Sequence, residues 1–226
     1  MSRPWPRTDR AAAVLLLLCS ALLGGCDECD PFDDGDVAGR DHSPDGVPYP
    51  QDNLGLTPRS GTTEGQHIPN FTFRGYVDSS RAAGLQTVSL ADYYDPESRR
   101  YKVLSLVAAA MWCPICGGQT EQMVVAAPAL RSEGVVIIEA IIDGPTGQIP
   151  PTLCDFDDWI ETHETNFTLV FDSGARRIGQ YAAISGVPYN ILVDTRTMEV
   201  LDAGVGAPLD YATYVRQAIS WVDANP

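Results

Sequence analysis

The stretch KVLSLVAAAMWCPICGG, residues 102–118, places two cysteines three positions apart, directly after an apolar run. Its first nine residues, 102–110, are almost continuously apolar, as expected of a strand that is covered on both faces. A second run of this kind follows at 135–143, after apolar residues at helical spacing between 117 and 132. Strand, helix and strand of these lengths predict a βαβ unit with parallel strands.

The C-terminal half of the chain continues with both kinds of element. Periodicity and turn residues predict three helices, at 155–164, 173–184 and 210–224, and three strands, at 167–172, 189–194 and 199–206. The last two strands should form a hairpin around residues 195–198. The fold class is therefore α/β, with a central mixed sheet flanked by helices.

The N-terminus has the pattern of an export signal. Three arginines precede an apolar run at 11–23, which is too short to span a bilayer comfortably. The run ends in LLGGC, which resembles the lipobox of bacterial lipoproteins, where the cysteine is lipidated. We expect a signal peptide at 1–25, a lipid anchor at Cys26 and a location in the cell envelope, facing the periplasm or the exterior. An ordinary secretory signal that ends in cysteine is the alternative.

The chain is acidic, with 30 Asp and Glu against 15 Lys and Arg and a formal net charge of −15. Such a surface repels nucleic acid, so nucleic acid is not an expected partner. Acidic residues, proline and glycine are concentrated in 26–66, which lacks apolar periodicity. This composition predicts a flexible tether, followed by one globular domain at 67–226.

The two cysteines of WCPIC occupy a reactive position. Cys113 falls at the end of a buried strand and the start of a helix, where unpaired amide groups and the helix dipole stabilise a thiolate. Cys116 lies one turn further, close enough to attack a mixed disulfide, and Pro114 suits the first turn of a helix. A structural zinc site would need four ligands, and His163 stands alone, so neither a metal nor another cofactor is expected. A purely structural disulfide would not explain the placement between strand and helix.

Residues 67–226 resemble the thioredoxin superfamily, and most of all the tethered thiol-disulfide oxidoreductases of the TlpA and ResA type with their redoxin relatives. HIPNFTFRG with TVSLADYY resembles the first hairpin of that group, and MWCPIC matches its Trp-Cys-x-x-Cys site, with Trp112 in place. SGVPYNILVD resembles the loop that carries a cis-proline. The resemblance implies a thioredoxin-like fold and a redox-active disulfide between Cys113 and Cys116.

The resemblance also implies how substrate is held. Pro188 would be a cis-proline packed against the cysteine pair, and the backbone of Val187 would pair with an extended substrate segment. Trp112 and Pro114 would border the same surface. An ordinary loop proline before a strand is the alternative for Pro188.

Two positions depart from related patterns. Val107 stands where thioredoxins have a buried aspartate that moves protons, and Glu139, inside an apolar strand, is the charged residue that could lie beneath the pair. A buried carboxylate would have a raised pKa and could accept the proton of Cys116. The alternative places Glu139 at a sheet edge, with its carboxylate in water. Ala110 stands where peroxiredoxins need threonine, which disfavours peroxide reduction.

Four of the six cysteines lie outside the WCPIC motif. Cys19 would leave with the signal peptide and Cys26 would carry lipid, so Cys29 and Cys154 remain as a predicted structural disulfide. A regulatory or resolving role for Cys154 is the alternative.

The sequence favours an extracytoplasmic thiol-disulfide oxidoreductase. We expect a reductase of protein disulfides, by analogy in cytochrome c maturation, with protein thiol clients and a membrane-embedded thiol electron donor as partners. The alternatives are a tethered adaptor that holds a partner or copper without turnover, and a peroxiredoxin-like peroxidase.

Overall fold

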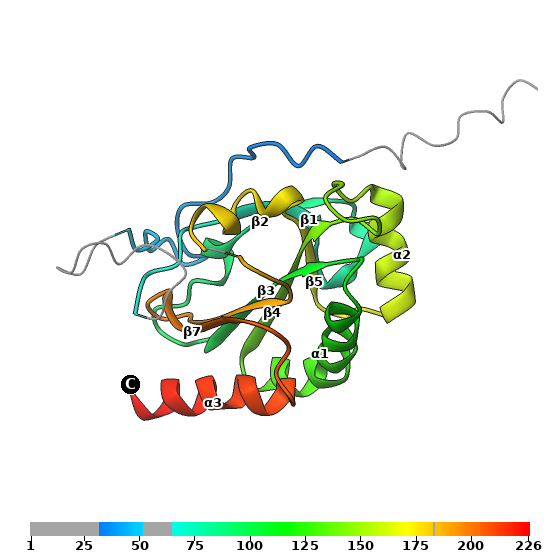
Figure 1. Ribbon diagram of the computed structural model, residues 1–226. Coiled ribbons are helices and arrows are strands. Elements are labelled where there is room, and N and C mark those ends of the chain that lie inside the picture. The colour runs from blue at the N-terminus through cyan, green and yellow to red at the C-terminus, as the bar shows by residue number, and fades with distance from the viewer. Residues whose placement is uncertain (1–31, 52–64, 183) are drawn as a thin grey trace, which may run out of the picture.

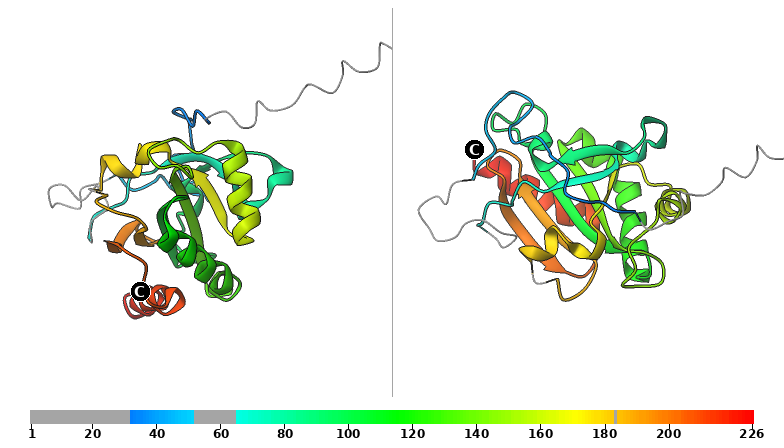
Figure 2. Two further views of the ribbon diagram at one scale, coloured as in Figure 1. Left: turned by 45° about the vertical axis from the view of Figure 1, so that its right-hand side comes forward. Right: turned by 90° about the horizontal axis from the view of Figure 1, so that it is seen from above.

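The computed structural model describes residues 32–51, 65–182 and 184–226. A seven-stranded mixed sheet with the order β2-β1-β5-β4-β3-β6-β7 forms the centre of the domain. The helices α1, α2 and α3 lie in a row along one face of this sheet, with α1 in the middle (Figures 1 and 2). Short 3-10 turns and part of the N-terminal segment cover the opposite face. This architecture confirms the α/β prediction.

The apolar part of the stretch quoted first forms an interior strand of the sheet. β3 (Val103–Ala110) is buried along its whole length, and it pairs in parallel with β4 (Val135–Asp143) and antiparallel with β6 (Tyr189–Asp194). α1 (Pro114–Ser132) connects β3 to β4, which gives the predicted βαβ unit. Its N-cap is Cys113, because the chain leaves the strand in an extended conformation at that residue.

The remaining elements extend the sheet on both sides. Their bounds are Thr72–Tyr76 for β1, Gln86–Ser89 for β2, Thr168–Phe171 for β5, Glu199–Val205 for β7, Leu153–His163 for α2 and Tyr211–Ala224 for α3. β1 and β2 form the antiparallel hairpin that the resemblance implied, and β6 and β7 form the predicted second hairpin. β5 lies parallel to β4 and antiparallel to β1.

The predicted helix at 173–184 is wrong. Two separate 3-10 turns occupy this stretch, Ser173–Ala175 and Ile178–Gln180. Gly174 and Ala175 have positive φ values of 65° and 54°, which a right-handed helix cannot contain. The buried carboxylate of Asp172 accepts the N–H groups of Arg177 and Ile178, and this local bonding replaces helical hydrogen bonds.

Residues 32–51 also differ from the expected flexible tether, because they lie against the domain. The ring of Phe32 packs on Phe171 with centroids 4.4 Å apart. Asp34, only 4% exposed at its side chain, pairs with Arg177 at 2.7 Å. The hydroxyl of Tyr49 donates to the Ile68 carbonyl at 2.8 Å. Composition did not indicate these contacts, because it shows only that the segment is acidic and therefore self-repelling. In the fold, one buried guanidinium and two aromatic side chains offset that repulsion.

Candidate active site

The two cysteines lie where β3 ends and α1 begins. Both are free thiols in this structure. The Sγ atom of Cys113 accepts the backbone N–H of Cys116 at 3.2 Å, as a helix-capping group would. Cys113 retains 6% exposure, whereas Cys116 is completely buried. Cys113 is therefore both the capping residue of α1 and the one of the two sulfurs that a substrate can reach.

The loop before β6 closes over this sulfur. The Val187–Pro188 peptide bond is cis, as the resemblance implied. The Cys113 Sγ atom lies 3.7 Å from the Val187 carbonyl oxygen. The Pro188 carbonyl in turn accepts the N–H of Gly206, at the end of β7. The cysteine pair and the loop are therefore brought together by two neighbouring strands, β3 and β6.

Glu139 lies inside the protein, on β4 beside Val107 of β3, and its exposure is 1%. The alternative of a carboxylate in water at a sheet edge is therefore wrong. One carboxyl oxygen contacts the Thr120 hydroxyl at 2.6 Å, and the other accepts the indole N–H of Trp159 at 3.2 Å. Burial raises the pKa of Glu139 to about 7, while the hydrogen bonds from Thr120 and Trp159 act in the opposite direction.

The second cysteine is more deeply buried than the first. Burial raises the pKa of the Cys116 thiol well above its ordinary value. Its hydrogen bond with Cys113 and the negative charges of Cys113 and Glu139 act in the same direction. Cys116 therefore remains a thiol until a base removes its proton. Glu139, with a pKa near neutrality, is a carboxyl group suited to that exchange.

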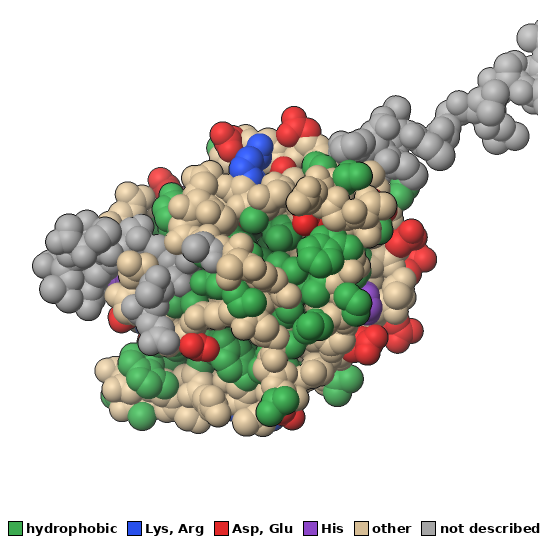
Figure 3. All heavy atoms as spheres, in the orientation of Figure 1, with side chains coloured by type: hydrophobic (Ala, Val, Ile, Leu, Met, Phe, Trp, Pro, Cys, Tyr) green, Lys and Arg blue, Asp and Glu red, His purple; other side chains and the backbone are tan. Residues whose placement is uncertain are grey.

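The residues next to Cys113 in the chain are apolar and exposed. Trp112 is 47% exposed and Ile115 is 61% exposed, and Pro114 between them is exposed as well. The Trp112 indole donates to Asp143 at 3.1 Å, which fixes the ring beside the loop that follows β4. Figure 3 shows hydrophobic side chains gathered near the middle of the face that is also seen in Figure 1. Such a surface suits a polypeptide substrate better than a small charged one.

Sequence reasoning missed the polar residues of α1 that support the site. Gln119 and Asn190 form a buried amide pair at 2.6 Å, which joins α1 to the strand that follows Pro188. Thr120 contacts both Glu139 and the Cys116 carbonyl. Because Gln119 and Thr120 follow Cys116 by three and four residues, helical spacing could have indicated that they lie one turn below it. No pattern in the sequence indicated that Trp159 would contact Glu139.

Cys154, near the start of α2, is disulfide-bonded, whereas Cys113 and Cys116 are not. The predicted partner Cys29 and the predicted lipidation site Cys26 lie outside the described residues. The pairing of Cys29 with Cys154 therefore stays a prediction.

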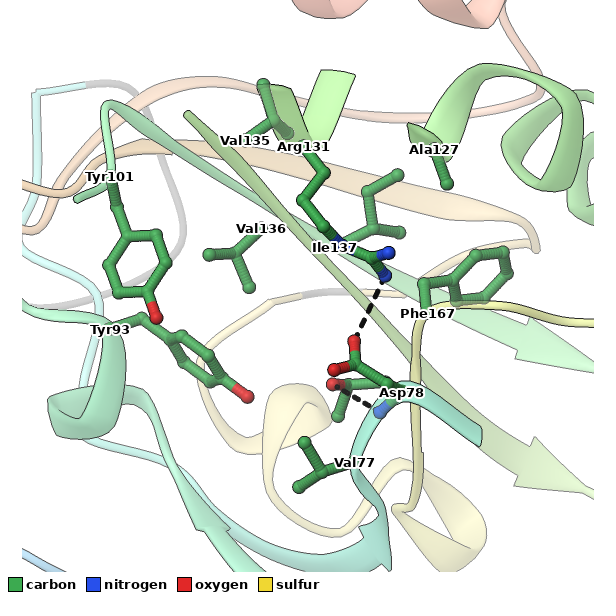
Figure 4. A pocket seen from close by; sticks show the side chains of 11 residues that line it. Val77, Asp78, Tyr93, Tyr101, Ala127, Arg131, Val135, Val136, Ile137 and Phe167 are labelled. Atoms are coloured by element: carbon green, nitrogen blue, oxygen red, sulfur yellow. Dashed lines mark hydrogen bonds and ion pairs between the residues drawn. The ribbon is translucent and has the colours of Figure 1, made fainter. Parts of the chain in front are cut away.

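A separate cavity of about 210 Å³ lies at the far end of the sheet, where β4 begins (Figure 4). Val136, Phe167 and Tyr93 contribute to its walls, and Arg131 pairs with Asp78 at 3.1 Å beside it. Neither Cys113 nor Cys116 lines this cavity. Within the described ranges, no three His, Cys, Asp or Glu side chains gather as metal ligands would. In the same ranges, no helix is long and apolar enough to cross a membrane.

Comparison with known proteins places these features in a family. Residues 65–202 match the model of the AhpC/TSA family. No curated protein sequence matches the chain. Among solved structures, the chain is similar to the thioredoxin domain of a thiol-disulfide oxidoreductase from Bacteroides vulgatus, with a TM-score of 0.54 and 18% identity over 70% of this chain and 98% of that one.

Two structures from Chlorobium tepidum are similar as well. A candidate thiol:disulfide interchange protein DsbE aligns with a TM-score of 0.52 and 22% identity, over 72% of this chain and 96% of that one. A thioredoxin-family thiol:disulfide interchange protein aligns with a TM-score of 0.51 and 18% identity, over 68% and 97%. These likenesses agree with the thioredoxin-like fold. The chain therefore belongs to the AhpC/TSA family and is an oxidoreductase with a thioredoxin-like fold.

Proposed function

We propose that this oxidoreductase exchanges thiols and disulfides with protein clients through Cys113 and Cys116. The observation that carries the proposal is the asymmetry of the pair. Cys113 caps α1, accepts the Cys116 N–H and lies 3.7 Å from the carbonyl of Val187, whereas Cys116 is a completely buried thiol. One sulfur is thus arranged as the nucleophile and the other as the resolving group.

The reductive reaction proceeds in two exchanges. The Cys113 thiolate bonds to one sulfur of the client disulfide, and the other client sulfur leaves as a thiolate. Cys116 then loses its proton and bonds to Cys113, which releases the second client thiolate and leaves a Cys113–Cys116 disulfide. Two electrons pass to the client. Its two thiolates take one proton that came from Cys116 and one from solvent.

Glu139 acts in the second exchange as the acceptor of the Cys116 proton. Its burial, its raised pKa and its position under the first turns of α1 support this role. Trp112, Pro114, Val187 and Pro188 form the surface against which the client segment lies.

The N-terminal sequence supports a location in the cell envelope, with a lipid anchor at Cys26 that faces the domain toward the periplasm or exterior. In that compartment the pair would be returned to the dithiol form by a membrane-embedded thiol donor. A reductase of protein disulfides, serving cytochrome c maturation, is our specific proposal by analogy with the tethered group that the sequence resembles.

Peroxide reduction is the second candidate, because the matched family carries the AhpC/TSA description. The residue three positions before Cys113 is Ala110, a buried strand residue with no hydroxyl to offer a peroxide. A peroxidase would consume hydrogen peroxide at the expense of reduced Cys113 in the absence of any disulfide client. Dithiol exchange with little peroxide turnover is the outcome we expect.

Replacing Cys116 by alanine tests the proposed function. The Cys116→Ala protein should accumulate mixed disulfides between Cys113 and client proteins, visible as reductant-sensitive high-mass bands. Cys113→Ala is the matched control and should trap nothing, since Cys116 is buried. An adaptor that binds without turnover would give no mixed disulfides in either variant, and this result would overturn the proposal.

A further inference from the structure

One hydroxyl group joins the buried carboxyl of Glu139 to the helix turn of Cys116. The Oγ1 atom of Thr120 lies 2.6 Å from Oε1 of Glu139 and 3.0 Å from the carbonyl oxygen of Cys116. Thr120 itself is completely buried. The other carboxyl oxygen of Glu139 accepts the indole N–H of Trp159 at 3.2 Å.

The hydrogen-bond partners of Glu139 suit both its ionised and its protonated form. A threonine hydroxyl has one hydrogen to donate and lone pairs that accept. When Glu139 is ionised, Thr120 donates to Oε1 and Trp159 donates to Oε2, so each oxygen has one donor. When Glu139 is protonated, its O–H donates to Thr120, whose own hydrogen turns to the Cys116 carbonyl. Rotation of one hydroxyl hydrogen therefore satisfies both charge states without moving a heavy atom.

We propose that Thr120 is a positioning residue of the resolving exchange: its hydroxyl holds the Glu139 carboxyl against the helix turn that carries Cys116, in a form that can gain and lose a proton in place. The inference rests on the proposed function, since it concerns the step in which Cys116 is deprotonated. The reaction scheme alone requires neither Thr120 nor the rotation of its hydroxyl hydrogen between Glu139 and the Cys116 carbonyl.

Groups from every element packed around Glu139 bear on this proton. α1 contributes Cys116, whose thiolate would repel a charged Glu139. α2 contributes Trp159, a fixed donor, and next to it His163, whose ring lies 4.2 Å from that indole and whose pKa is lowered mainly by burial. α3 contributes Tyr211, which donates to Ser105 and whose pKa burial raises, so it stays neutral. Thr120 differs from these groups because its hydroxyl, which can both donate and accept, contacts the Glu139 carboxyl directly.

The experiment compares Thr120→Val, Thr120→Ser and wild-type protein, all as the full chain. Valine keeps the shape of threonine and removes the hydroxyl, whereas serine keeps the hydroxyl. Thr168→Val is a matched control, because Thr168 is also buried and its hydroxyl accepts the Asp78 N–H. Thr168 is the register partner of Ile138, so strand alternation places its side chain on the sheet face opposite that of Glu139. Thermal unfolding of all four proteins verifies that each is folded.

Two rates are measured between pH 5.5 and 9. The attack of Cys113 on a disulfide-bonded peptide is isolated in the Cys116→Ala background. The complete single turnover, which includes resolution, is followed with Cys116 present. Loss of one hydrogen bond to a carboxylate should move the acid limb of the turnover profile up by about one pH unit, which lowers the rate on that limb about tenfold. Serine should restore the wild-type profile, and Thr168→Val should leave it unchanged.

An unshifted turnover profile in Thr120→Val, or an equal loss of the attack rate in the Cys116→Ala background, would overturn the role of Thr120. Failure of the proposed function looks different. In that case wild-type protein itself would show no turnover of the peptide disulfide at any pH, whatever residue occupies position 120.

Discussion

Replacing Glu139 by glutamine should stabilise the protein at neutral and alkaline pH, although glutamine is polar and the site is buried. The pKa of Glu139 is raised to about 7 in the fold, mainly by burial, against an ordinary value of 4.5. Below about pH 4.5 the carboxyl is protonated whether the chain is folded or not. As the pH rises from there toward 7, only the unfolded chain gives up its proton, so the free energy of unfolding falls.

The loss in the free energy of unfolding of the wild-type protein is complete just above pH 7. The difference between 4.5 and about 7 corresponds to about 3 kcal/mol of lost stability in the wild-type protein. Glutamine does not titrate, and it reproduces the hydrogen bonds of the protonated acid. Its oxygen accepts from Trp159 and its NH₂ group donates to Thr120, which can then donate to the Cys116 carbonyl.

Urea denaturation at pH 5 and pH 8 measures this difference. Both proteins are kept under the same reducing conditions, so that the state of Cys154 cancels. The variant should gain little at pH 5 and about 3 kcal/mol at pH 8, relative to wild type. Glu164→Gln, which removes an exposed carboxylate on the surface, serves as the control for the loss of one acidic side chain. A stability difference for Glu139→Gln that is the same at both pH values would refute the reasoning.

Three further outcomes follow from the described contacts. Iodoacetamide at pH 7 should label Cys113 and leave Cys116 unmodified, because Cys116 is fully buried and its pKa is raised; peptide mass mapping would report equal labelling if this were wrong. Asp34→Ala should lower the free energy of unfolding by about 3 kcal/mol, since it leaves the Arg177 guanidinium without its closest carboxylate; a loss near zero would mean that residues 32–51 do not stabilise the fold. Thr152→Ala removes the N-cap of α2 and should cost about 1 kcal/mol by the same measurement, with retention of full stability as the contrary result.

The sequence predicted the centre of the fold because its signals there agree. The apolar runs of β3 and β4, the helical spacing between them and the turn before β7 all point to one topology. Prediction failed at 173–184, where the periodicity suits a helix. There the Asp172 carboxylate accepts the backbone N–H groups of Arg177 and Ile178, which would otherwise form helical hydrogen bonds. Prediction failed again at 32–51, because contacts such as the one between Phe32 and Phe171 join residues far apart in the chain.

The active site divides in the same way. The position of Cys113 and Cys116 between strand and helix followed from the motif, and the cis bond before Pro188 followed from the family resemblance. Glu139 remained ambiguous, since an apolar run does not reveal which side of a strand is covered by polar partners. The structure resolves that ambiguity through Thr120 and Trp159, which come from two different helices.

The most direct test of the central claim is a redox titration of the Cys113 and Cys116 pair in glutathione and dithiothreitol buffers, read by alkylation and mass mapping of the peptide that carries both. We predict a reversible two-electron couple, and for a reductase a midpoint near that of thioredoxin, about −270 mV. A midpoint near about −120 mV would retain the exchange chemistry and reverse the direction to disulfide donation. The absence of any reversible couple between Cys113 and Cys116 would contradict the account.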